Sequence, residues 1–384
     1  MKRIYLDYSA TTPVDPGVVE EITRYYTDFF GNASSVHSFG RDARVALERA
    51  REAVAGLINA EPEEIVFTSG GTEADNLAIK GVVYRHSNKK NHIISTRVEH
   101  HAVLNTCDFL AEEGFEVTHI PVDGHGAVDP EAVKDSITDR TLLISIIHGN
   151  NEVGTINPIE EIGKIARERG VYFHSDTVQS YGKIPIDVKQ MNLDLCSISA
   201  HKIYGPKGTG ALYIRKGIPI QPLNHGGHHE RKRRAGTENL PGIMGLAKAA
   251  RICADKMDQE IGYISDLRDR FWKMLKEEIE GVYLNGHPSM RLPGIVNVSF
   301  SGVEGESLLL SLDLKGIAAS SGSACSSGTT EPSHVLKAMG IDPVLARGSI
   351  RFSLGRNTTG QEIEYTVEVL KREVARLRKI SAVV

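Results

Sequence analysis

The fold is most restricted by the stretch Ser197-Ile198-Ser199-Ala200-His201-Lys202-Ile203-Tyr204-Gly205-Pro206-Lys207-Gly208. A strand-like run ends at Ser199, and Lys202 follows it among small residues and turns rich in Gly and Pro. A lysine on a solvated surface does not need that setting. Lysine amines form Schiff bases with carbonyl compounds, and the neighbouring Ser199 and His201 are able to donate hydrogen bonds to a phosphate. The stretch predicts a lysine presented to a ligand at the end of a strand.

Two earlier segments also place ligand-binding groups after strands. The turn Thr68-Ser69-Gly70-Gly71-Thr72-Glu73 opens a helical run, where glycines and helix N-terminal amides suit a phosphate. Taken alone it is more often a tight connection, because the fuller phosphate-loop pattern is absent. Asp176 ends an apolar strand, where it fits either a helix cap or a partner for a cationic ring nitrogen. With Lys202, these parts are the ones that a pyridoxal phosphate (PLP) site requires.

Seven short β-rich runs alternate with helical stretches in the first two thirds of the chain. This alternation predicts an α/β fold with a largely parallel sheet. Apolar residues at helical spacing predict helices over 42–58 and 158–169. The predicted strands are 64–68, 92–96, 116–121, 141–148, 171–176, 194–199 and 211–215.

The pattern of predicted secondary structure changes in the last third of the chain. A long, charged helical region over 247–280 precedes strand-like runs at 294–299 and 350–353 and a closing helix over 359–379. We therefore expect a large domain over 14–256. We expect the first residues to return to a smaller domain, which would comprise 1–13 and 257–384.

Composition restricts the partners and the location. The 384 residues include 45 Lys and Arg against 49 Asp and Glu, so the net charge of -4 offers no general attraction to nucleic acid or to an anionic membrane. No apolar run has the length of a signal peptide or a membrane span. We expect a cytoplasmic protein with no nucleic-acid or membrane partner. The charged run 230–234 fits a solvated loop as well as a site.

The four cysteines fall into two kinds. Cys325 lies among Ser, Gly and Ala in the stretch 318–330, which predicts a thiol that is displayed rather than packed. Cys107, Cys196 and Cys253 lie in apolar contexts, which predicts packing roles. No CxxC pair is present, so we expect reduced thiols and no metal site.

Together these motifs resemble the NifS/IscS-type cysteine desulfurases, a branch of the aspartate aminotransferase-like PLP enzymes. The resemblance spans nearly the whole chain and implies the fold of that branch, with a mainly parallel seven-stranded sheet in the large domain and a smaller α+β domain. Besides the segments around Asp176, Lys202 and Cys325, it is carried by YLDYSATTP at 5–13, GNASSVH at 31–37, GGTEADN at 70–76, EHHA at 99–102, NNEVG at 150–154 and RAGT at 234–237.

The resemblance implies a role for each matching residue. Lys202 would form the Schiff base, Asp176 would pair with the ring nitrogen, and Gln179 would donate to the ring oxygen. Cys325 would receive sulfur from L-cysteine as a persulfide, which leaves L-alanine. His100 would stack on the ring and transfer protons. The phosphate would be bound by Gly71, Thr72, Ser199 and His201, and by Thr237 from the second subunit of a homodimer. The substrate would be contacted by Asn32, Asn151 and Arg351, and Asn151 would also contact the ring.

Three other functions remain open at this point. Selenocysteine lyase chemistry needs the same lysine without requiring Cys325, an aminotransferase has no use for a displayed thiol, and a sulfur carrier could keep the fold without catalysis. A sulfur-acceptor protein is expected, with an iron-sulfur scaffold as one candidate. The chain shows no clear match to the C-terminal tail with which related proteins dock such a scaffold, so the acceptor stays open.

Overall fold

The computed structural model describes residues 3–86, 90–321 and 332–381. All seven predicted strands form one sheet, in the order β2-β8-β7-β6-β5-β3-β4. Its pairs are parallel except those of β8, which is antiparallel to both β2 and β7, so the prediction of a mainly parallel α/β sheet is confirmed. The strands are β2 (Ile65–Thr68), β3 (His92–Thr96), β4 (Glu116–Ile120), β5 (Thr141–Ser145), β6 (Tyr172–Asp176), β7 (Leu195–Ser199) and β8 (Gly210–Ile214).

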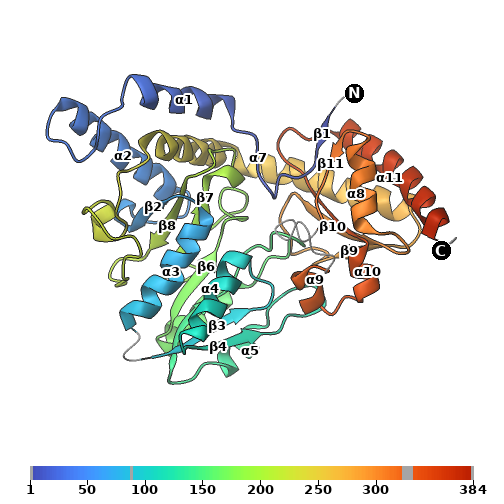
Figure 1. The fold of residues 1–384 in the computed structure, drawn as a ribbon, viewed down its shortest axis with the longest axis horizontal. Coiled ribbons are helices and arrows are strands. Elements are labelled where there is room, and N and C mark those ends of the chain that lie inside the picture. The colour runs from blue at the N-terminus through green and yellow to red at the C-terminus, as the bar shows by residue number, and fades with distance from the viewer. Residues whose placement is uncertain (1–2, 87–89, 322–331, 382–384) are drawn as a thin grey trace.

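Helices cover both faces of this sheet (Figure 1). Because side chains alternate across a strand, Ile94 and Ile144 point into one core and Ile93 and Leu143 into the other. The first core receives α1 (Pro16–Thr27), α2 (Ser38–Gly56), α5 (Pro130–Asp135), α6 (Ile159–Arg169) and the start of α7 (Leu240–Glu278), and the second receives α3 (Gly71–His86) and α4 (His101–Glu112).

A third core lies in the C-terminal part of the chain, around an antiparallel sheet of order β12-β10-β9. The chain's first strand, β1 (Ile4–Tyr5), pairs with β11 (Ile317–Ala318), so the N-terminal segment lies with this region. The predicted boundary near residue 256 falls inside α7, which runs without a break between the two regions (Figure 1), and the division into domains stays a prediction. The other elements here are β9 (Val282–Asn285), β10 (Ile295–Phe300), α8 (Gly305–Asp313), α9 (His334–Ala338), α10 (Pro343–Arg347), β12 (Ser349–Ser353) and α11 (Gly360–Ser381).

Cys107, Cys196 and Cys253 are buried, which confirms their predicted packing. Cys325 lies outside the described residues. No helix within the described parts of the chain combines the length and the apolar character that a membrane crossing needs.

The charged run 230–234 is more than a solvated loop. Glu230 is buried and accepts from both terminal nitrogens of Arg51, at 2.7 and 2.9 Å, and from the Phe67 amide. Arg234 pairs with Glu73 in the first turn of α3, at 2.8 Å. The run is therefore tied to α2 and β2 by a buried charge and to the start of α3 by a half-buried ion pair.

Candidate active site

Most of the predicted site residues gather in one cavity of about 320 Å³ at the carboxyl ends of the parallel strands. The ends of strands in the large sheet and the first turns of helices that pack on it form most of the cavity wall. Arg351 reaches the cavity from β12. Of the predicted residues that the structure describes, Asn32 and Thr237 do not line it, and Cys325 lies outside the described residues. The lining residues are Ser9, Ala10, Gly71, Thr72, Asp75, His100, Ile147, Asn151, Asp176, Val178, Gln179, Ser199, His201, Lys202 and Arg351.

Lys202 is placed by the short turn that follows β7. Its Nζ donates to the carbonyls of Ser9 and Ala10, at 2.6 and 2.8 Å. The Gly that follows this turn is required by packing, since a Cβ at Gly205 would lie 2.8 Å from the Ala200 carbonyl oxygen. The glycine-rich setting seen in the sequence thus serves a tight turn that aims the amine into the cavity.

Asp176 is the last residue of β6 and has two roles. Its Oδ1 accepts from the Val178 amide at 2.9 Å, so it caps a turn and also lines the cavity. Burial raises the pKa of Asp176 to about 6, while the charge of Lys202 acts to lower it. A carboxylate in this setting gains from a cationic partner.

Gln179 is held from both sides. Its Nε2 donates to the Ser9 carbonyl at 2.8 Å, and Lys183 donates to its Oε1 at 2.8 Å. Burial lowers the pKa of Lys183 to about 7. Lys183 was not among the residues predicted from the sequence, and Ser9 was part of a recognised motif but was not predicted as a site residue.

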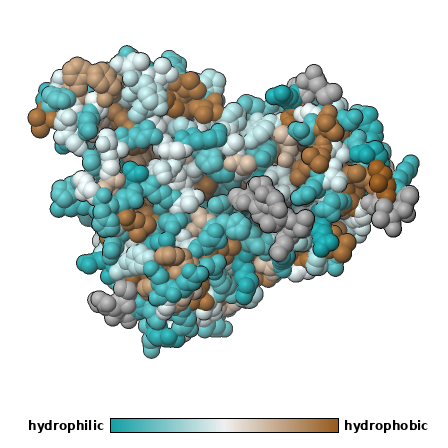
Figure 2. Space-filling view, in the orientation of Figure 1, coloured by the Kyte–Doolittle hydropathy of each residue, from teal (hydrophilic) through white to brown (hydrophobic). Residues whose placement is uncertain are grey.

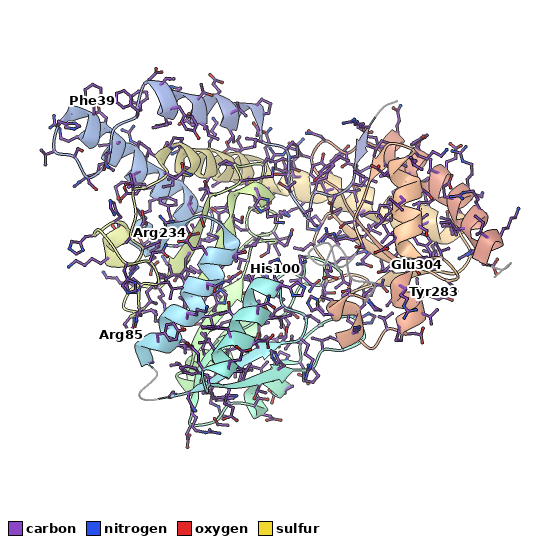
Figure 3. All side chains as sticks on the ribbon, viewed as in Figure 1. Phe39, Arg85, His100, Arg234, Tyr283 and Glu304 are labelled. Atoms are coloured by element: carbon purple, nitrogen blue, oxygen red, sulfur yellow. The ribbon has the colours of Figure 1, made fainter. Side chains whose placement is uncertain are left out.

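His100 stands at the start of α4, near the centre of the molecule in Figure 3. Its Nδ1 accepts from the Ala102 amide at 3.1 Å, so in the neutral ring the proton resides on Nε2. Burial, and then the charge of Lys202, lower the pKa of His100 to about 4. His100 is therefore a neutral imidazole with an Nε2–H available as donor.

The first turn of α3 fits a phosphate. Gly71 and Thr72 begin this helix, where amides without an intrahelical partner point outward. A Cβ at Gly71 would lie 2.7 Å from a methyl of Val178, so a side chain there would crowd the cavity wall. Ser199 and His201 complete this side of the cavity, and burial lowers the pKa of His201 to about 4.

Arg351 is 3% exposed and anchored by two oxygens. Its Nη2 donates to Oδ1 of Asp7 at 2.9 Å, and its Nη1 donates to the Asn151 carbonyl at 3.0 Å. Asp7 was part of a recognised motif but was not predicted as a site residue. It orients the guanidinium, the group whose planar fork suits a carboxylate.

Asn32 and Thr237 lie together elsewhere. They line a second cavity of about 390 Å³ with Tyr26, Phe30 and other residues. Within one chain, then, the structure does not bring them to Lys202. Asp75, by contrast, lines the Lys202 cavity although it was not among the residues predicted from the sequence. Asp75 stands three residues after Thr72 at the start of a predicted helix, so the two side chains lie on one helix face, and this spacing could have indicated that Asp75 lies near the site.

Comparison with known proteins identifies the class. Residues 4–366 match the family described as Aminotransferase class-V, and the chain belongs to that family. A cysteine desulfurase IscS of Dictyoglomus turgidum is 54% identical over 382 residues, which cover 99% of this chain and 97% of the relative. A cysteine desulfurase IscS of Methanosarcina thermophila is 52% identical over 380 residues, which cover 99% of this chain and 94% of the relative.

Solved structures agree with this grouping. One named NifS-like protein has a TM-score of 0.92 at 38% identity and covers 97% of this chain and 100% of that chain. Another, described as SspA in complex with cysteine, has a TM-score of 0.82 at 38% identity and covers 93% of this chain and 100% of that chain. Within its family, the chain belongs to the NifS/IscS-type cysteine desulfurases, as the motifs predicted.

Proposed function

We propose that this chain uses PLP to remove sulfur from L-cysteine, with release of L-alanine and formation of a persulfide on Cys325. The observation that carries the proposal is the convergence of Lys202, Asp176, His100 and Arg351 on one cavity from separate elements. An amine, a buried carboxylate, a neutral imidazole and an oriented guanidinium supply what a PLP enzyme acting on an amino acid needs.

The residues present fit the cofactor. Lys202 would bind its aldehyde, Asp176 its ring nitrogen and Gln179 its ring oxygen, while Gly71, Thr72, Ser199 and His201 would hold the phosphate. A second buried carboxylate, Asp75, has an oxygen with no hydrogen-bond partner among the described residues, which favours a cationic group in this cavity. When bound, PLP supplies an electron sink for bonds to the amino-acid Cα.

The chain's own residues would then position the substrate and move protons. Arg351, oriented by Asp7, would bind the carboxylate of cysteine, and Asn151 lies against the same guanidinium. The Lys202 amine would take the Cα proton. His100 is neutral at physiological pH because of its lowered pKa, and it presents Nε2–H as a hydrogen-bond donor, since its Nδ1 accepts from the Ala102 amide.

A homodimer would complete the site. Asn32 and Thr237 share a cavity beside exposed apolar side chains of the α1–α2 corner, which include Tyr26 at 68% and Phe30 at 64% exposure. Figure 2 shows hydrophobic residues gathered at that corner, and Figure 3 marks Phe39 there. A second subunit would cover this surface and receive Thr237 at its own phosphate site. The protein acceptor of sulfur and the cytoplasmic location stay predictions from the sequence.

The test combines an absorption spectrum with product assays. The purified protein should absorb visible light as a PLP enzyme, and Lys202→Ala should abolish alanine formation. Cys325→Ala should still bind L-cysteine but release no sulfide. Lys207→Ala removes an exposed lysine of the same loop and should leave the rates unchanged. A protein that cannot be loaded with PLP would refute the proposal, and normal cysteine turnover by Cys325→Ala would favour the selenocysteine lyase alternative.

A further inference from the structure

Asp75 is a buried acid that the proposed reaction leaves without a role. It lies on α3, is 1% exposed and lines the same cavity as Asp176. Its Oδ1 has no hydrogen-bond partner among the described residues. A buried polar atom of this kind costs free energy unless a ligand or a proton satisfies it.

Among the described residues, the basic side chain that lies within 4.0 Å of the Asp75 carboxylate is that of His174, and it supplies no positive charge. His174 Nε2 lies 3.6 Å from its Oδ1, but both ring nitrogens of His174 already contact Ser145 and Ser197 hydroxyls, at 2.8 and 3.0 Å. Burial lowers the pKa of His174 to about 3, so this ring is neutral at physiological pH. A hydrogen bond from Ser197 offsets only part of the cost of charging Asp75.

A second carboxylate is close by. One ligand atom each of Asp75, Asp176 and His100 lie within 4.8 Å of one another. Burial, and next the charge of Asp176, raise the pKa of Asp75, and Glu99 adds to the same effect. Lys202 acts on Asp176, whose pKa it lowers. Two carboxylates this close and this buried do not both ionise without a cation.

We infer that Asp75 is a second carboxylate of the ring-binding site, which shares one proton with Asp176 until a cationic ring nitrogen pairs with them both. The inference rests on the proposed function and extends it, since the resemblance assigns the ring nitrogen to Asp176 alone. The number of protons in the site is unchanged by this step. A neutral pyridine ring would take the shared proton on its nitrogen, which leaves two carboxylates and one pyridinium, and no further acid is required.

The consequence is a ring nitrogen held protonated by two negative charges. At about 5 Å and an effective dielectric constant of about 20, a second charge raises the pKa of a cation by about two units. Asp75→Asn keeps the shape of the side chain but removes its charge. This variant separates an electrostatic role, which shifts a pKa, from a packing role, which does not.

The experiment follows the ring nitrogen directly. The chain and its variants are loaded with PLP labelled with nitrogen-15 in the ring, and the nitrogen chemical shift is measured against pH without substrate. Asp75→Asn should lower the pKa of the ring nitrogen by at least one unit, a tenfold change. Asp194→Asn is the matched control, because Asp194 is a buried acid beside the opposite end of β7 that pairs with Arg215. It should leave that pKa unchanged.

The outcomes distinguish a failure of the proposed function from a failure of the inference about Asp75. A wild-type chain that takes up no PLP would refute the proposed function itself. A loaded Asp75→Asn variant with the wild-type ring pKa would overturn the inference alone. If Asp75→Asn takes up no PLP, infrared spectra of the wild type decide: a protonated carboxyl band that disappears on loading supports the shared proton, and a band that persists or was never present overturns it.

Discussion

At the scale of single residues, Lys183 determines which end of the Gln179 amide faces Ser9. The Ser9 carbonyl accepts and the protonated Lys183 amine only donates, so together they favour the orientation in which Gln179 turns its oxygen to Lys183 and its NH₂ toward Ser9. A donor is also what the proposed ring-oxygen contact needs. Lys183 is thus a positioning residue rather than a catalytic one.

We predict that Lys183→Met weakens PLP binding about three- to tenfold, because one hydrogen bond of about 0.5–1.5 kcal/mol no longer fixes the amide. Lys183→Arg, which keeps a donor, should recover most of the affinity. Titration of the visible band with PLP measures both. Equal affinities for the Met variant and the wild type would show that Gln179 is oriented without Lys183.

Glu152 provides a pH-dependent prediction. Burial raises its pKa from the ordinary 4.5 to about 7, although Ser333 donates to it and Arg351 lies near. Because the folded state holds this proton more tightly than the unfolded chain, its contribution is greatest at low pH and is lost as pH rises through 7. Relative to Glu152→Gln, the wild type should therefore lose up to about 3 kcal/mol of unfolding free energy between pH 4.5 and pH 8.

Urea unfolding at both pH values measures this difference. Glutamine keeps an acceptor for Ser333, so the comparison isolates the charge of Glu152. A difference between wild type and variant that does not change with pH would contradict the raised pKa.

At the scale of elements, two helical glycines have opposite surroundings. A Cβ at Gly163 in α6 would lie 1.9 Å from the Met191 carbonyl oxygen, whereas one at Gly56 in α2 would meet nothing within 4 Å. Gly163→Ala should destabilise the protein by about 1–3 kcal/mol through forced backbone shifts. Gly56→Ala should stabilise it by about 0.5 kcal/mol through helix propensity. Urea unfolding compares them, and equal effects would contradict the close packing of α6 on the 189–192 turn.

At the scale of the whole molecule, the proposed dimer predicts complementation between subunits. If Thr237 serves the partner's site, a mixed dimer of Lys202→Ala and Thr237→Asp subunits contains one intact site and one with both defects. Such dimers, isolated through two different tags, should show about half of the wild-type rate of alanine formation, while both parent dimers are nearly inactive. A mixed dimer no more active than its parents would refute the shared site.

Much of the scaffold was predictable because the patterns are local. The seven strands follow from short apolar runs bounded by turns, and all seven lie within three residues of the predicted bounds. Lys202 and Asp176 were selected because Asp176 ends a strand and Lys202 lies in the turn after one, and the carboxyl ends of parallel strands meet at one edge. Asp75 and Asp7 were not selected because each acts with a residue distant in the chain. Lys183 was not selected because a single lysine four residues after Gln179 forms no motif by itself.

The sequence by itself determined the kind of fold, the family and the identity of the reactive side chains, because the spacing of apolar residues and the short motifs are local properties of the chain. Only the tertiary structure decided which of these groups meet. The crossovers between strands bring α3 beside β6, so that Asp75 and Asp176 share one cavity, and the return of the N-terminus beside β11 sets Asp7 against Arg351. It also placed Asn32 and Thr237 away from Lys202. Contacts of this kind depend on strand order and on the path of the chain in space, which no local pattern specifies.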